Sequence, residues 1–310
     1  MEYHEPAVWW KLYDLHDFES YCREFVIRGR FHPSVPGEIR EEYLLAEYMM
    51  AHAYYHPLLY DEAYSKVLRI VELAVKLRCT QLGLKNDKIL AGLIDDITTK
   101  EPTKGLNDLL HKLRDDRNKY MHASKDRDLG GILRARMRRC VVLLNVLFMD
   151  EQYFLKAHEH KLLMMDKMEP LGIGAYALKL KDKEVLAELM LLSATVHTAD
   201  GWVYCLHIAP VPEKVDDILE GELPEWIPFP VKDLVIEPNK VTALLADIGE
   251  LITITRTNNP VTLAHLNKYE AKRNEASEQY LKRAELLHMM HLDISLVKFG
   301  YDWGWQATDI

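Results

Sequence analysis

Residues 109–123, with the sequence LLHKLRDDRNKYMHA, carry the most informative pattern in this chain. Through this stretch and just before it, one set of positions recurs at steps of three or four residues, the spacing of one face of an α-helix. These positions are Leu106, Leu110, Leu113, Arg117 and Met121. Arg117 is thus in line with a stripe expected to be buried, whereas an arginine that only adds solubility usually faces the opposite side.

Two more polar residues accompany Arg117. Asn118 and His122 are four residues apart, so they project from one face, close to Arg117, if the helix persists that far. Histidine exchanges protons near neutral pH, a guanidinium can hold phosphate oxygens through two N–H groups, and asparagine can orient either of them. The three residues therefore predict a site for phosphodiester cleavage. In the competing structural reading, Arg117 caps the helix or pairs with an acid, and His122 simply ends the helix.

The motif Arg117-Asn118-x-x-x-His122 resembles the Arg-polar-x-x-x-His signature of the HEPN family, and the resemblance covers about residues 38–150. It implies a homodimeric helical bundle in which two copies of the motif form a composite active site. It also implies a metal-independent RNA endonuclease, with His122 in acid–base catalysis or phosphate positioning, Arg117 stabilising the transition state and Asn118 orienting. The expected products carry a 2′,3′-cyclic phosphate and a 5′-hydroxyl. No metal or other cofactor is expected, because the 2′-hydroxyl of RNA is the nucleophile.

The resemblance also implies a biological setting. HEPN proteins include toxins, abortive-infection factors and antiviral defence ribonucleases, so an antitoxin or a regulatory protein is a candidate partner besides RNA. A toxin masked by such a partner, or by the acidic remainder of the chain, is one variant of this hypothesis. Many members of the family are inactive, and a noncatalytic module that binds RNA, a nucleotide or a partner protein remains the alternative.

The charge distribution is compatible with an anionic ligand near the motif. Residues 111–140 contain ten basic and four acidic residues, although the whole chain has a net charge of −9. Such a reversal predicts a local anion-binding surface on a protein that otherwise repels nucleic acid, although a solvated, arginine-rich helix face is the simpler reading. The candidate RNA-binding residues are Lys112, Arg114, Lys119, Lys125, Arg134 and Arg138.

Apolar periodicity predicts helices through the first half of the chain. The expected helices cover residues 38–56, 61–82, 88–97, 106–121 and 132–168, the last as one helix or two. We therefore expect an N-terminal extension over residues 1–37 and a HEPN-like antiparallel bundle over residues 38–168.

Residues 170–310 have a different character. The stretch 193–210 alternates around Asp200-Gly201, which predicts a β-hairpin with Trp202, Tyr204 and Leu206 on one face. Prolines then keep the chain extended or looped, and helices are expected over residues 241–255 and 261–291. The predicted fold class is mainly α, namely the helical bundle followed by a smaller α+β region of unknown role.

Composition excludes several classes of protein. The four cysteines form no CxxC pair, the N-terminus does not resemble a signal peptide, and no apolar run approaches the length of a membrane span. We therefore expect a cytoplasmic protein without membrane contact. His52 and His56 have the spacing of two metal ligands, but no glutamate completes an HExxH arrangement. The triplet Gly172-Ile173-Gly174 lacks the remaining glycine and the Lys-Ser or Lys-Thr of a phosphate loop. Neither a metal site nor a nucleotide-binding loop is predicted.

Overall fold

The computed structural model divides the chain into two compact units. The helical unit comprises Met1–Phe154 and Gly300–Trp305, and the barrel unit comprises Leu155–Phe299 and Gln306–Ile310. The residues that the structure describes are 5–7, 10, 13–99, 103–121, 130–181, 183–215, 225–275 and 278–308. Each unit has its own hydrophobic core, so each is described separately.

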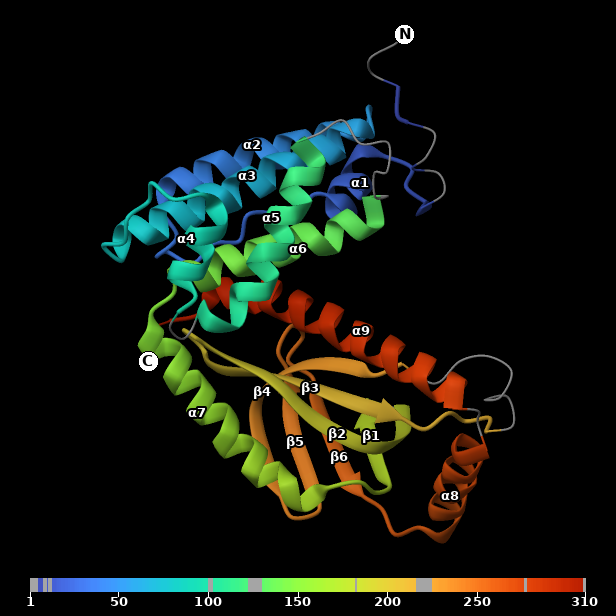
Figure 1. Ribbon diagram of the computed structural model, residues 1–310. Helices are drawn as coiled ribbons and strands as arrows, with labels where there is room; N and C mark the ends of the chain where they lie inside the picture. The colour runs from blue at the N-terminus through green and yellow to red at the C-terminus, as the bar shows by residue number, and fades with distance from the viewer. Residues whose placement is uncertain are drawn as a thin grey trace. The chain divides into compact units, whose positions relative to one another are not determined.

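The helical unit is organised around α3 (Figure 1). Its helices are α1 (Phe18–Phe25), α2 (Gly37–His52), α3 (Leu58–Gln81), α4 (Leu90–Ile97), α5 (Asn107–Met121) and α6 (Gly130–Phe148), with the short 3₁₀ helix η2 (Thr103–Leu106) before α5. Helix α3 packs against α2, α4, α5 and α6. It can do so because its apolar residues occupy more than one face, with adjacent pairs such as Val67-Leu68 and Ile70-Val71 buried. The helices expected from periodicity in this half are confirmed.

Buried tyrosines attach the N-terminal segment to this core. The hydroxyl of Tyr21 donates to the carbonyl of Met50 at 2.8 Å, and that of Tyr60 donates to the carbonyl of Phe25 at 2.7 Å. Each ring fills apolar space while its hydroxyl donates to a carbonyl at a helix end, a hydrogen bond that a phenylalanine would not make. Helix α1 therefore belongs to the same core as α2 and α3.

The chain returns to the helical unit near its C-terminal end. Helix α9 (Glu278–Trp303) finishes there, and Tyr301 is buried with its hydroxyl donating to the carbonyl of Arg28 at 3.0 Å. Beside it, Nη1 of Arg30 lies 2.9 Å from Oδ1 of Asp302. The helical unit is thus built from two separate parts of the sequence.

The barrel unit contains a closed antiparallel sheet of six strands (Figure 1). The strands are β1 (Tyr176–Leu180), β2 (Lys183–Thr198), β3 (Gly201–Pro210), β4 (Ile227–Glu237), β5 (Lys240–Leu245) and β6 (Leu251–Arg256). Each strand pairs with the next, and β6 pairs back with β1, so that Leu178 lies opposite Ile254. The hairpin expected around Asp200-Gly201 is confirmed as β2–β3, with Thr198 opposite Gly201.

The barrel corrects the fold class expected from the sequence. The prediction of a mainly α protein, a HEPN-like helical bundle with a smaller α+β region, is wrong, because the chain is 57% helix and about 21% strand and closes a complete barrel. The helix predicted over residues 241–255 is also wrong, since these residues form β5 and β6. Their side chains alternate in burial with a period of two, and the turn between them contains Gly249 with φ +68°, a conformation that β-branched residues avoid.

Apolar side chains fill the barrel. The buried strand residues of its core are Tyr176, Leu178, Ala187, Met190, Leu192, Tyr204, Leu206, Ile208, Val231, Val241, Ala243, Leu245, Ile252 and Ile254. Met164 and Met168 of α7 (Glu151–Met168) join this cluster. A small barrel closed in this way is a packed core and has no exposed strand edges.

Strand β3 is also buried on its outer face. Val203, Cys205 and Ala209 are nearly inaccessible there, and His207 is fully buried. Nδ1 of His207 lies 2.7 Å from Oγ of Ser193, and its Nε2 lies 2.5 Å from Oγ of Ser295 on α9. Both ring nitrogens are therefore satisfied within the barrel unit. Within the described residues, no helix combines the length and apolar character that crossing a bilayer requires.

Candidate functional site

Helix α5 brings together two of the three residues predicted to be catalytic. Nη1 of Arg117 donates to Oδ1 of Asn118 at 3.2 Å, and Nη2 of Arg117 lies 3.0 Å from Oε2 of Glu72 on α3. The Arg117 side chain is 33% exposed and Asn118 is exposed. The guanidinium is thus fixed on one side by α3 while part of it faces solvent.

Glu72 is the residue that holds Arg117. Its other oxygen, Oε1, accepts from Nζ of Lys76 one helical turn along α3 at 2.8 Å. Burial raises the pKa of Glu72, but the hydrogen bond and charge of Lys76, together with Arg117, outweigh it and leave the pKa below its ordinary value of 4.5. Glu72 is therefore a carboxylate at neutral pH. We call this arrangement the Arg117–Glu72 clamp.

The third predicted residue, His122, lies outside the described residues, as does Lys125. Helix α5 is described as far as Met121, so the motif is followed in the structure up to the residue before the histidine.

The remaining candidate RNA-binding residues have different surroundings. Lys112 and Lys119 are exposed on α5. Arg114 binds Oδ1 of Asp115 through Nε and Nη2 at 3.1 and 2.7 Å, and its Nη1 lies 2.9 Å from Nδ1 of His111. These contacts hold the side chain of Arg114 against α5, the helix that also carries Arg117. The carboxylate of Asp115 partly neutralises the charge of Arg114.

Two of the candidates on α6 are directed elsewhere in the helical unit. Arg134 lies over the ring of Phe25 at 4.9 Å, with its Nη2 3.6 Å from Oε2 of Glu24. Arg138 lies over the ring of Tyr301 at 5.8 Å. A different arginine of α6, Arg136, reaches α5, with its Nη1 3.5 Å from Oδ2 of Asp116. The structure therefore groups Arg117, Asn118 and Arg114 on α5, and gives Arg134 and Arg138 aromatic partners.

The sequence reasoning missed Glu72 and the nearby dyad of Asp95 and His111. Nε2 of His111 lies 2.9 Å from Oδ1 of Asp95, which lowers the pKa of that carboxyl. For Glu72, the available signal was the Glu72-x-x-x-Lys76 spacing on a predicted helix, which is typical of an ion pair. That spacing gave no sign that α5 would lie beside it.

Comparison of the chain with protein-family models, with curated proteins and with solved structures finds no match.

The site must therefore be interpreted from its own chemistry. It contains a fixed and partly exposed guanidinium, an amide oxygen in contact with it, and exposed lysines on the same helix. Such a set can hold an anion with several oxygens, because the guanidinium supplies directed N–H donors and the lysines supply long-range attraction.

Proposed function

We propose that the helical unit is a metal-independent RNA endonuclease whose active site is built on the C-terminal part of α5. The observation that supports this most strongly is the clamp, in which Glu72 fixes the guanidinium of Arg117 beside Asn118 while part of it remains open to solvent. A group fixed before the substrate binds stabilises developing charge without having to reorganise during the reaction.

In the proposed reaction the 2′-hydroxyl oxygen of RNA attacks the adjacent phosphorus. The O2′–P bond forms and the P–O5′ bond breaks, which gives a 2′,3′-cyclic phosphate and a 5′-hydroxyl. The proton of the 2′-hydroxyl passes to a base, and the leaving 5′-oxygen takes up a proton. His122 exchanges protons in these steps, Arg117 donates to a nonbridging phosphate oxygen, and Asn118 orients the guanidinium.

Glu72 has a positioning role in this proposal. Its carboxylate neutralises part of the charge of Arg117 but also restricts a long side chain that would otherwise sample many rotamers. Restriction of the Arg117 side chain also suits the homodimer that the HEPN resemblance implies. In that dimer, two motifs facing each other would present two fixed guanidinium groups to one phosphate. We place the reaction in the cytoplasm, where RNA substrate is present.

The test is cleavage of end-labelled tRNA and total RNA in the presence of EDTA. We expect wild type to cut, and Arg117→Ala and His122→Ala to lose at least about a hundredfold in rate, the usual size of an acid–base or charge-stabilising contribution. Arg69→Ala, at an exposed position of α3, is the matched control and should cut as wild type does. The cut ends should accept phosphate at the 5′ side without prior phosphatase treatment.

Cleavage that persists in both folded variants would remove the catalytic assignment. Circular dichroism and thermal unfolding of each variant exclude loss of the fold as the reason for lost activity.

The clamp also favours a second candidate function, noncatalytic RNA binding. Arg117 already has Glu72 as an ionic partner, so the ion pair can serve the packing of α5 on α3 without a catalytic role, while the exposed Lys112 and Lys119 of α5 attract RNA by charge alone. If RNA bound to the wild-type protein is recovered intact after long incubation, and Arg117→Ala weakens its binding, this second function is the correct one.

A further inference from the structure

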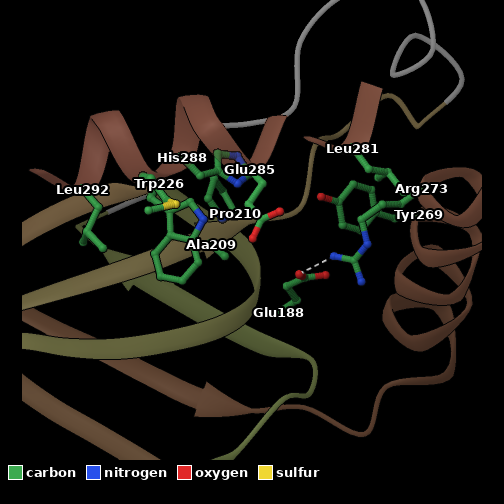
Figure 2. A pocket seen from close by; sticks show the side chains of 11 residues that line it. Glu188, Ala209, Pro210, Trp226, Tyr269, Arg273, Leu281, Glu285, His288 and Leu292 are labelled. Carbon is green, nitrogen blue, oxygen red and sulfur yellow. Dashed lines mark hydrogen bonds and ion pairs between the residues drawn. The ribbon is translucent and has the colours of Figure 1, made fainter. Parts of the chain in front are cut away.

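A pocket of about 380 Å³ lies on the outside of the barrel, between the strands, α8 (Pro260–Glu275) and α9. Its volume falls within the usual range of about 300–1,000 Å³ for small-molecule sites. All the residues that line it belong to the barrel unit: Glu188, Ala209, Pro210, Trp226, Tyr269, Arg273, Leu281, Glu285, His288, Met289 and Leu292. Figure 2 shows Glu188 and Arg273 toward one end, Trp226 with apolar neighbours toward the other, and Glu285 between them.

A β-bulge places Glu188 at this pocket. The register of β2 against β3 shifts between Ala187 and Leu189, so Glu188 has no partner of its own on β3. Bulges redirect side chains and are common beside functional sites. Oε1 of Glu188 accepts from Nη1 of Arg273 on α8 at 2.6 Å (Figure 2). The strand irregularity therefore brings a carboxylate to the pocket and links it to α8.

The second oxygen of this carboxylate is not used. Among the described residues, Oε2 of Glu188 is buried and has no hydrogen-bond partner, and Nε2 of His288 is in the same condition. A buried carboxylate oxygen without a donor is costly, and such groups call for an explanation. An ion pair that only attaches α8 to the barrel would not need this second oxygen to lie unpaired at a pocket.

The charges and apolar surfaces of the pocket favour one kind of ligand. The positive charge of Arg273 is matched by Glu188, and the carboxylate of Glu285, which Figure 2 shows directed into the pocket, adds a further negative charge. The indole of Trp226 lies 6.4 Å from the ring of His288 and forms a flat apolar wall. A cation is attracted by the excess negative charge and by the face of an indole, and an anion is repelled.

We propose that this pocket binds a small organic cation with a flat apolar body. Its N–H groups donate to Oε2 of Glu188 and to the carboxylate of Glu285, and its body lies against Trp226. The proposal concerns the barrel unit alone and is independent of the ribonuclease proposal for the helical unit.

The test uses three probes of nearly equal shape on the full chain: benzamidine, which is a cation at neutral pH, neutral benzamide and anionic benzoate. Binding is followed by the indole N–H resonance of Trp226, which is assigned by its disappearance in Trp226→Phe. We expect benzamidine to shift this resonance in a saturable way, benzamide to bind at least about tenfold more weakly, and benzoate to cause no shift.

Charge-neutral variants locate the interaction. Glu188→Gln retains an oxygen for Arg273 but loses the free carboxylate oxygen, and we expect it to weaken benzamidine binding by about tenfold. Glu285→Gln should weaken it to a smaller degree, because Glu285 is exposed. Glu184→Gln is the matched control, since Glu184 lies on the same strand but is exposed and paired with Lys179. It should bind benzamidine as wild type does.

Equal binding of benzamidine and benzoate, benzamidine binding that is unchanged in Glu188→Gln, or no saturable shift of the Trp226 resonance at millimolar benzamidine would each overturn the proposal. An unchanged midpoint of thermal unfolding in Glu188→Gln shows that the loss of binding does not result from loss of the fold.

Discussion

The imidazole of His160 stacks on the indole of Trp202, with ring centroids 3.8 Å apart and planes within 6° of parallel. Nε2 of His160 also lies 3.0 Å from the hydroxyl of Tyr204. These contacts attach α7 to β3 within the barrel unit. Burial lowers the pKa of His160 below its ordinary value of 6.5, and the nearby Lys167 and His197 lower it further.

We expect His160 to titrate below pH 6.5 in the folded protein. As the pH falls, the unfolded chain then takes up a proton at this histidine before the folded chain does. The stability that depends on neutral His160 is therefore present above pH 6.5 and is lost as the pH falls toward the folded pKa. The Cε1 proton resonance of His160, assigned with His160→Gln, measures this pKa, and a midpoint at or above 6.5 would contradict the expectation.

The Arg117–Glu72 clamp should have the acid dependence of a carboxylate. The pKa of Glu72 is lowered in the folded state, so its contribution is present above the unfolded value of about 4.5 and is lost as the pH falls through the folded value. We expect Glu72→Gln to lower the free energy of unfolding at pH 7 by about 0.5–2 kcal/mol.

This difference should shrink as the pH falls through the lowered pKa of Glu72, because the wild-type carboxyl is then itself protonated. Urea unfolding at several pH values measures it, with Glu41→Gln at an exposed position of α2 as control. A difference that persists unchanged at low pH would show that the charge of Glu72 is not what stabilises the packing of α5 on α3.

Substitution of the fully buried His207 alone should lower the free energy of unfolding. His207→Leu leaves the hydroxyls of Ser193 and Ser295 without their shared partner, and we expect it to cost about 2–4 kcal/mol in chemical unfolding. Adding Ser193→Ala and Ser295→Ala to it should recover part of the loss, because no polar group is then left unsatisfied. A triple variant less stable than His207→Leu would refute this account of the cluster.

Tyr301 should stabilise the helical unit although it lies far from α1–α6 in the sequence. Tyr301→Phe removes the hydrogen bond to the carbonyl of Arg28 and should cost about 1 kcal/mol, while Tyr301→Ala also removes the buried ring and should cost about 3–5 kcal/mol. Hydrogen exchange of α1 and α2 amides checks that the loss falls in the helical unit. Greater exchange confined to the barrel unit would contradict it.

The helices of the first half could be predicted because each one carries its own periodicity. The barrel could not, since closure depends on β1 pairing with β6, two strands separated by almost the whole of the sheet in sequence. Residues 241–255 misled the prediction because their apolar residues also fit helical steps of three and four, whereas Val241, Ala243 and Leu245 follow the period of two that the barrel uses.

In the candidate site, too, contacts between sequence neighbours could be predicted and contacts between distant residues could not. The contact of Arg117 with Asn118 joins neighbours on one helix, and the sequence was sufficient to suggest it. The contact of Arg117 with Glu72 joins α5 to α3, and only the tertiary structure reveals it. The interaction that fixes the guanidinium was therefore the part that periodicity could not supply.

The return of Tyr301 and Asp302 to the helical unit has a consequence for biosynthesis. On the ribosome, α1 to α6 emerge first, but the carbonyl of Arg28 and the guanidinium of Arg30 obtain Tyr301 and Asp302 as partners only after residues 155–299 of the barrel unit have been translated. The region that carries the proposed nuclease motif therefore spends the time needed to synthesise the barrel without its last stabilising contacts. The first half of the chain therefore completes its folding only after the second half has been synthesised.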